Sequence, residues 1–328
     1  MTFRSVSSLS RRLLSLSLLA CLLPFLFTAV ALSEQPAASS GLPLQQRIHD
    51  QLALLHVREQ AKASAYELGY RWALLGAEYA NAGDFANSEN SYNHSLQLLS
   101  TDPSAATLYA DVFDLLGALY RIYDRIPESL NCRRKALALR QQLGDPLKVA
   151  RSKSHLAELA LMSHKFKDAF GSADQAYESM TQLHDPDKAD LLSALIVRSY
   201  AECALHKCDR GLEDAQQALA ISRNAFAGDS VPVGAALIAL GSAELKNGAV
   251  AEAENSMHQA LQIFKMQFAA ADPRLSYALL QYRDCLLAQH RKKEAREIDD
   301  QVSALDRQST SSCPSCTVSV FGLRTPAP

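Results

Sequence analysis

Residues that interrupt helices are scarce in this sequence. Glycine occurs 13 times and proline 12 times in 328 residues, while hydrophobic residues account for 48%. β-Branched residues are sparse beside alanine and leucine, which have high helix propensities. The composition therefore predicts an all-α protein and argues against a large β-sheet.

An excess of charge of one sign is also missing. The 33 lysine and arginine residues nearly balance the 35 aspartate and glutamate residues, so the net charge is −2. Nucleic-acid binding needs a basic surface that neutralises phosphates. We therefore expect no nucleic-acid partner.

The motifs of common enzyme active sites are absent as well. The sequence has no glycine-rich phosphate loop, no His-Glu-x2-His and no Gly-x-Ser-x-Gly. Gly228-Asp229-Ser230 resembles an esterase motif, but it precedes an expected helix, where Asp229 and Ser230 would cap free N–H groups. We expect a protein without a catalytic site, a cofactor or a metal ion.

The first 31 residues are typical of an export signal. Arg4, Arg11 and Arg12 precede residues 13–32, LLSLSLLACLLPFLFTAVAL, which carry no charge. Ala29-Val30-Ala31 matches the small-residue cleavage pattern of such signals. The pattern predicts an exported protein, periplasmic or secreted, whose mature chain keeps 30 basic and 35 acidic residues.

Two alternatives to cleavage at Ala31 remain open. The apolar run of 20 residues is long enough to stay in the bilayer as a membrane anchor. Leu18-Leu19-Ala20-Cys21 also resembles the cleavage box of a bacterial lipoprotein. In each case residues 44–328 lie outside the cytoplasm, and the membrane is contacted only through residues 13–32 if they are retained.

A short motif recurs along the chain at a nearly constant spacing. Leu75-Gly76-x2-Tyr79 returns as Leu116-Gly117-x2-Tyr120 and, more weakly, as Leu240-Gly241-x2-Glu244. Gly117 follows Gly76 by 41 residues, and Gly241 lies 124 residues further, which is about three such periods. Degraded copies fill the gaps at Leu156-Ala157, Arg198-Ser199 and Tyr282-Arg283. The spacing predicts six units over residues 66–305.

Signals for helix starts recur in the same phase. Aspartate caps free N–H groups and proline fits the first helical turn, so a helix is expected after each Asp-Pro pair. These pairs are Asp102-Pro103, Asp145-Pro146, Asp185-Pro186 and Asp272-Pro273, and Asp229 with Pro232 takes this place in the fifth unit. Each unit is therefore expected to be a helix–turn–helix, and an amphipathic helix over 44–65 is expected to cap the first one.

This pattern resembles the tetratricopeptide repeat family. Trp72, Leu75, Gly76 and Tyr79 match the signature Trp-x2-Leu-Gly-x2-Tyr, and the long period is similar to that of kinesin light chains and many bacterial proteins. The resemblance implies a right-handed superhelical solenoid of about six helix–turn–helix repeats. It also implies that the first helix of each pair lines a concave groove for a protein or peptide partner.

The resemblance further implies which side chains face that groove. The expected partner-binding residues are Tyr70, Asn81, Asp111, Asp114, Arg121, Arg151, Glu158, Tyr200, Lys246, Tyr277 and Asp284. The subtype that clamps a C-terminal carboxylate needs lysine and asparagine where this chain has Ala73 and Ala77. Recognition of that kind is therefore not expected.

The cysteines leave several interpretations open in an oxidising compartment. Cys203 and Cys208 could form a local disulfide, could join His206 as soft metal ligands, or could stay as idle thiols. Cys313-Pro-Ser-Cys316 has the spacing of a redox motif. Because the βαβ context of such motifs is missing, we expect a structural loop or a disulfide there.

Together these features predict a non-enzymatic scaffold or adaptor of the cell envelope or secreted space. The expected organisation is an export signal or anchor (1–31), a linker (32–43), a capping helix (44–65), the repeat array (66–305) and a flexible tail (306–328). Two alternatives are retained. One is a membrane-tethered accessory subunit of an envelope complex, and the other is a thiol-redox protein that uses Cys313 and Cys316.

Overall fold

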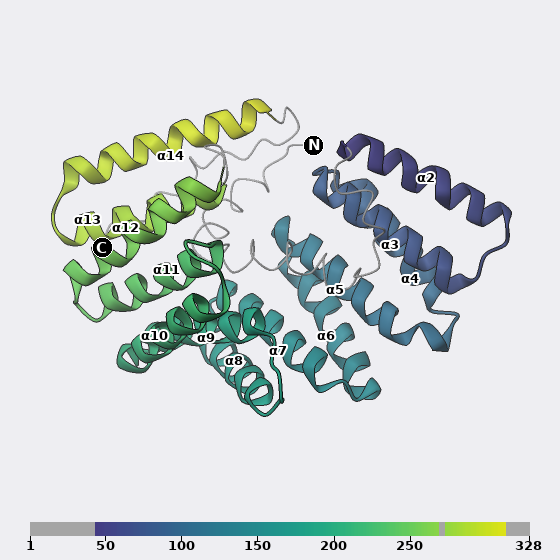
Figure 1. Ribbon diagram of the computed structural model, residues 1–328, viewed down its shortest axis with the longest axis horizontal. Helices are drawn as coiled ribbons and strands as arrows, with labels where there is room; N and C mark the ends of the chain where they lie inside the picture. Colours follow the sequence, from purple (N-terminus) through teal and green to yellow (C-terminus); the bar gives the residue numbers. More distant parts are fainter. Residues whose placement is uncertain (1–42, 269–272, 313–328) are drawn as a thin grey trace. The chain divides into compact units, whose positions relative to one another are not determined.

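The computed structural model describes residues 43–268 and 273–312. Within these ranges the chain forms thirteen α-helices, one short 3-10 helix and no strand (Figure 1). The helices are α2 (Leu44–Gln60), α3 (Ala65–Asn81), α4 (Phe85–Leu99), η1 (Pro103–Ala105), α5 (Ala106–Ile122), α6 (Ile126–Leu143), α7 (Pro146–Met162), α8 (Phe166–Thr181), α9 (Lys188–Ala204), α10 (Cys208–Ala225), α11 (Val231–Lys246), α12 (Val250–Gln267), α13 (Pro273–Ala288) and α14 (Lys292–Ser312). The predicted all-α class is confirmed.

The chain divides into two compact units, which we describe separately. The boundary lies within α7, between Ser152 and Lys153. The N-terminal unit, as described from residue 43 to 152, holds α2 to α6 and the start of α7. The C-terminal unit, as described over 153–268 and 273–312, holds the rest of α7 and α8 to α14.

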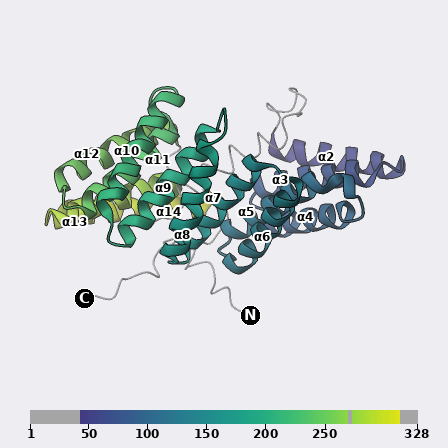
Figure 2. The same ribbon diagram turned by 90° about the horizontal axis from the view of Figure 1, so that it is seen from below.

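The helices pair as helix–turn–helix hairpins, as the repeat spacing predicted. The first helices of the six pairs begin 40–43 residues apart, at Ala65, Ala106, Pro146, Lys188, Val231 and Pro273. The two helices of a pair lie side by side in both views, as α3 with α4 and α11 with α12 show (Figures 1 and 2). This is the arrangement of a helical-repeat solenoid, in which stacked hairpins bury one another's apolar faces.

Each hairpin turn contains one left-handed residue at the same phase of the repeat. These residues, with φ between 55° and 83°, are Gly83, Asp124, His164, His206, Gly248 and His290. The N–H of the next residue bonds to a carbonyl five residues earlier, as Lys207 does to Glu202 at 2.9 Å, which is the Schellman ending of a helix. Three histidines and one aspartate thus occupy the place that glycine takes in the other two turns.

Close packing within a hairpin depends on small residues that face each other. Ser88 Oγ of α4 donates to the carbonyl of Gly76 in α3 at 2.8 Å, and Ser129 Oγ of α6 donates to the Gly117 carbonyl at 2.7 Å. The α9–α10 hairpin has the same kind of bond, from Ser199 Oγ to the Gly211 carbonyl at 2.6 Å. Here the serine lies on the first helix, α9, and the glycine on the second, α10. The apparently degraded Arg198-Ser199 copy therefore keeps the small-residue contact.

Helix α2 covers the first hairpin, but it is shorter than the predicted segment 44–65. Its buried Ile48 and Leu55 pack in one cluster with Leu75 of α3. The helix ends at Gln60, and Lys62 in the following turn has φ 56°. A left-handed residue ends the helix before residue 65.

At the other end, α14 runs past the predicted array boundary at 305. It continues to Ser312, so the first seven residues of the predicted tail, 306–312, are helical. Neither glycine nor proline follows Leu305 before Cys313, so no helix-stop residue ends α14 at 305.

The predicted helix starts are correct at some Asp-Pro pairs and displaced at others. α7 begins at Pro146, and the Asp145 carboxylate accepts the N–H of Lys148 at 3.0 Å. Asp102-Pro103 instead opens η1, and α5 starts at Ala106. Helix α9 does not start at Asp185-Pro186 but two residues later, at Lys188. Its cap is Asp187, whose carboxylate accepts the N–H of Ala189 at 2.8 Å.

Several predicted features lie outside the described residues. They are the export signal or anchor (1–31), nearly all of the linker, and the Cys313/Cys316 pair in the tail. Of the helices in the described ranges, none is both long and apolar enough to cross a membrane.

Candidate partner-binding surface

The eleven residues expected in the groove differ widely in exposure. Asn81 and Lys246 are exposed, while Tyr70, Asp111, Tyr200 and Asp284 are half-buried. The other five are at most 6% exposed, namely Asp114, Arg121, Arg151, Glu158 and Tyr277. Side chains with so little accessible area offer little direct contact. The first six therefore remain the candidates for direct contact with a partner.

In the N-terminal unit, two of the expected residues belong to an ion cluster between α5 and α6. We call Asp111, Asp114, Arg133 and Arg140 the α5–α6 ion cluster. Arg140 donates to both aspartates, with 2.8 Å to Asp111 Oδ1. Arg133 donates to Asp114 Oδ1 at 3.2 Å. Asp114, Arg133 and Arg140 are all at most 4% exposed, so their charges are matched inside the unit.

The Leu-Gly motif makes room for this cluster. A Cβ atom on Gly117 would lie 3.1 Å from Cγ of Arg133. The glycine thus lets the arginine stem lie against α5 while its guanidinium reaches Asp114. The motif that revealed the repeat has a packing role here, and Asp114 is an internal ion-pair partner.

In the C-terminal unit, the structure brings two expected residues together. The hydroxyls of Tyr200 on α9 and Tyr277 on α13 are 3.4 Å apart, although 77 residues separate them. Ser242 on α11 hydrogen-bonds Tyr200 and lies 3.3 Å from Oε1 of Gln281 on α13. We call Tyr200, Ser242, Tyr277 and Gln281 the tyrosine cluster. It joins the first helices of three successive hairpins.

The chemistry of the tyrosine cluster is that of neutral hydrogen-bonding groups. Burial raises the pKa of Tyr200, and burial together with the neighbouring Tyr200 raises the pKa of Tyr277 well above its ordinary value. Both phenols therefore stay protonated at neutral pH and can donate as well as accept. Neutral hydroxyl and amide groups of this kind can hydrogen-bond a peptide backbone.

The sequence pattern missed an ion cluster of α8, α9 and α10. Arg198 pairs with both carboxylate oxygens of Asp214 at 2.6 Å and with Asp174 at 2.8 Å. Its guanidinium also lies 4.4 Å from the centre of the Tyr177 ring. Burial, and next the carboxylate of Asp214, raise the pKa of the nearby Glu202 carboxyl to about 7. Arg198 appeared in the sequence only as a departure from the Leu-Gly motif, so no signal marked this cluster.

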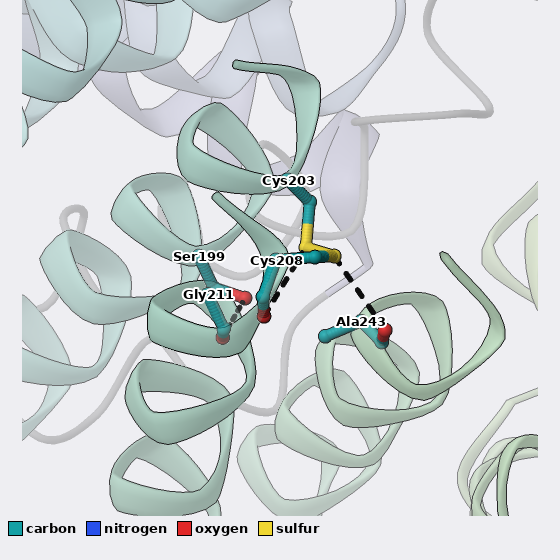
Figure 3. Close-up of a disulfide and its surroundings, with 5 residues drawn as sticks. All are labelled: Ser199, Cys203, Cys208, Gly211 and Ala243. Atoms are coloured by element: carbon teal, nitrogen blue, oxygen red, sulfur yellow. Dashed lines mark hydrogen bonds between the residues drawn. A yellow bond between two sulfur atoms is a disulfide. The ribbon is translucent and has the colours of Figure 1, made fainter. Parts of the chain in front are cut away.

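Figure 3 shows the disulfide that joins Cys203 at the end of α9 to Cys208 at the start of α10. Two sulfurs bonded to each other are not available as thiolate ligands, so the metal interpretation of this segment does not apply. Cys132 and Cys285 are free and buried. Burial raises the pKa of Cys132 to about 11 and that of Cys285 to about 12, which keeps both as unreactive thiols.

A separate polar cavity of 380 Å³ lies among α10, α11 and α12. It is lined by Arg223, Gly228, Asp229, Val233, Leu237, His258, Gln259, Gln262 and Ile263. None of the expected groove residues is among them. In the described ranges, no group of three or more His, Cys, Asp or Glu side chains could hold a metal ion.

Comparisons with known proteins support the fold assignment. No family model and no curated protein matches the sequence. The structure is similar to BtubC (BKLC) from P. vanneervenii, with 21% identity, 69% of this chain and 92% of that chain covered, and a TM-score of 0.58. It is also similar to kinesin light chain TPR-like repeats from Podosopora anserina, with 15% identity, 62% and 99% coverage, and a TM-score of 0.51.

A third similar structure contains a bound signalling factor. A Rap protein complexed with Competence and Sporulation Factor matches with 12% identity, 82% of this chain and 78% of that chain covered, and a TM-score of 0.56. At such identities the likeness shows the fold alone. The chain thus has a tetratricopeptide-like repeat fold, as its motif spacing predicted.

Proposed function

We propose that this protein is a non-enzymatic adaptor that binds a peptide or protein along the first helices of its hairpins. The observation that carries the proposal is the tyrosine cluster, in which three first helices bring neutral hydrogen-bonding side chains together. Half-buried Asp284 and exposed Lys246, on α13 and α11 of the same unit, add charges of both signs. The Rap structure supports the proposal by its complex with Competence and Sporulation Factor.

We further propose that the adaptor works outside the cytoplasm. The proposal is supported by the basic, apolar and small-residue order of residues 1–31. A retained apolar run over 13–32 would make the protein a membrane-tethered subunit instead of a released one.

Site-specific photo-crosslinking in the native host tests the binding surface. A photo-reactive residue is placed at Asn81 or Lys246, which are exposed near the ends of the first helices α3 and α11. Matched controls are Asn90 and Lys265, which are exposed on the second helices α4 and α12. We expect one discrete crosslinked partner at the first two positions and none at the controls. Equal crosslinking at all four positions would remove the first-helix assignment.

A second measurement links that partner to the tyrosine cluster. Tyr200→Phe removes one hydroxyl and keeps the ring, so the fold should survive. If the Tyr200 hydroxyl hydrogen-bonds a neutral group of the bound protein, its removal should weaken the binding of the crosslinked protein about tenfold. This is the upper range for one neutral hydrogen bond. Unchanged affinity in a folded variant would exclude the cluster as a contact.

The N-terminus of protein isolated from the native host tests its location. Mass spectrometry should find a mature chain that starts at Leu32. An intact Met1 in the membrane fraction would instead identify an anchor, and a lipid-modified Cys21 would identify a lipoprotein. An intact Met1 in a soluble cytosolic fraction would contradict export.

A further inference from the structure

The disulfide occupies two positions that recur in every hairpin. Cys203 lies three residues before the left-handed His206, and Cys208 lies two residues after it. At the place of Cys208 the other five hairpins have Phe85, Ile126, Phe166, Val250 and Lys292. At the place of Cys203 they have Ala80, Arg121, Leu161, Leu245 and Leu287. A bulky apolar side chain is therefore the usual residue at the start of the second helix.

The first hairpin shows what that apolar side chain does. Phe85 begins α4, and its ring centre lies 4.5 Å from that of Tyr123 in the next hairpin. Arg125 adds a guanidinium 5.5 Å from the same ring. The aromatic side chain thus fixes its own turn and ties it to the following one.

The α9–α10 turn lacks such a side chain, and the disulfide takes its place. Cys203 is 8% exposed and lies over Gly211, whose added Cβ would be 2.8 Å from the Cys203 sulfur. The Cys208 sulfur is 3.6 Å from the carbonyl oxygen of Ala243 on α11 (Figure 3). The two bonded sulfurs therefore contact their own hairpin at α10 and the neighbouring hairpin at α11. Phe85 makes the corresponding contacts for the α3–α4 hairpin.

We propose that the α9–α10 hairpin is a redox-dependent element, closed while Cys203 and Cys208 are bonded and loosened when they are reduced. Reduction removes the covalent constraint on the turn, and the two sulfurs must then move apart from bonding to van der Waals distance in a place where both are packed against α10 and α11. Because a repeat contacts mainly its neighbours, the loosening stays local and leaves the array folded. The proposal does not depend on the identity of a binding partner.

The chemical step is a thiol–disulfide exchange with an external dithiol. One thiolate of the dithiol attacks one sulfur, the Cys203–Cys208 bond breaks, and a mixed disulfide forms. The second thiol of the reductant then displaces the protein sulfur and closes its own disulfide. Two electrons and two protons end on Cys203 and Cys208, and the reductant is oxidised by the same amount.

Hydrogen exchange with and without dithiothreitol tests the proposal. The reporters are the amides of Lys207 and Gly211, which bond to the carbonyls of Glu202 at 2.9 Å and Lys207 at 3.2 Å. Internal controls are Ala249 and Ala253 in the next hairpin, with equivalent bonds of 2.9 and 3.0 Å. We expect about tenfold faster exchange at the reporters on reduction and no change at the controls. Unchanged reporters in protein whose two thiols alkylate fully would overturn the proposal.

Two double variants separate the covalent bond from the packing it replaces. Cys203→Ala with Cys208→Phe reproduces the Ala80 and Phe85 pair of the first hairpin, and it should match the oxidised protein with or without dithiothreitol. Cys203→Ser with Cys208→Ser should exchange as fast as the reduced protein in both conditions. If the serine variant stays as protected as the oxidised protein, the bond is not needed and the proposal fails. If the Ala/Phe variant exchanges as fast as the reduced protein, the packing explanation fails.

Discussion

The α5–α6 and α9–α10 hairpins reach one backbone arrangement with exchanged residues. In α5–α6 the glycine of the close contact is on the first helix and the serine on the second, and in α9–α10 the order is reversed. The charges are exchanged as well. Asp114 on the first helix α5 meets arginines on α6, whereas Arg198 on the first helix α9 meets Asp214 on α10.

The exchange shows what three of the hairpins share at the helix crossing. In α3–α4, α5–α6 and α9–α10 the helix crossing combines one residue without a Cβ with one hydroxyl that donates to the buried carbonyl. It does not matter which helix supplies each of them. Similarly, a charge near the crossing needs a partner across the hairpin, and either sign can come from either helix.

The largest expected effect comes from removing the more buried of the two acids of the α5–α6 ion cluster. Asp114→Asn takes the shared carboxylate from Arg133 and Arg140, both at most 4% exposed, and leaves Arg140 with Asp111 alone. Two buried guanidinium groups then share one half-buried carboxylate, so the free energy of unfolding should fall by about 3–5 kcal/mol. The matched change Asp214→Asn should cost only about 1–2 kcal/mol, because it affects one arginine, Arg198, which is 14% exposed and keeps Asp174.

Denaturant unfolding followed by hydrogen exchange in each unit measures both changes, since a repeat array need not unfold in one step. If the two substitutions lower the free energy of unfolding by the same amount, the deeper burial of the α5–α6 ion cluster does not affect stability.

A smaller effect is expected from adding one methyl group to each glycine. A Cβ on Gly211 would lie 2.8 Å from the backbone carbonyl oxygen of Ser199, which cannot move independently of α9. Gly211→Ala should therefore cost about 1–3 kcal/mol. At Gly117 the obstacle is the flexible stem of Arg133, so Gly117→Ala should be within about 1 kcal/mol of neutral.

Gly171 on α8 provides the control, because a Cβ there would meet nothing within 4 Å. Gly171→Ala should raise the midpoint of thermal unfolding through helix propensity alone. A loss at Gly171 as large as that at Gly211 would mean that the close approach at Gly211 is not the cause.

Part of this comparison was accessible from the sequence and part was not. The motif at Gly76 and Gly117 gave the period, and the period located the helix pairs. Arg198-Ser199 looked like a lost copy because the glycine had moved to α10, outside the motif. The groove residues were placed by repeat phase alone, and phase does not reveal that Asp114 would meet Arg140, since that contact depends on the neighbouring helix.

A pH effect is expected from the α9–α10 hairpin, where Glu202 lies near another carboxylate. Burial, followed by repulsion from Asp214, raises the pKa of Glu202 from 4.5 to about 7 in the folded protein. Between these values the folded state binds more protons than the unfolded state, so stability should fall as pH rises from about 4.5 to about 7. Arg198 and Arg210 oppose this shift.

Glu202→Gln should reduce this slope and stabilise the protein at pH 8 by on the order of 1 kcal/mol. Glu213→Gln, an exposed site on the same helix pair, should leave the slope unchanged. Thermal unfolding of the three proteins across this pH range measures it. A slope that is undiminished in Glu202→Gln would place the titrating group elsewhere.

The smallest expected effects concern the left-handed turn residues, which the two hairpins fill differently. His206 in the α9–α10 turn is exposed and has φ 62°, and Asp124 in the α5–α6 turn has φ 55°. A left-handed conformation costs a histidine about 1–2 kcal/mol. Glycine avoids this cost, but its unfolded chain is more flexible, so it loses more conformational entropy on folding. His206→Gly should therefore gain up to about 1 kcal/mol, whereas Asp124→Gly should be near neutral because aspartate tolerates this conformation. Gly248→Ala is the reverse change at φ 83° and should lower the free energy of unfolding by about 1 kcal/mol.

Thermal unfolding of the three variants measures these effects. If His206→Gly destabilises the protein while Gly248→Ala does not, the turn conformation is not what limits the stability of these hairpins.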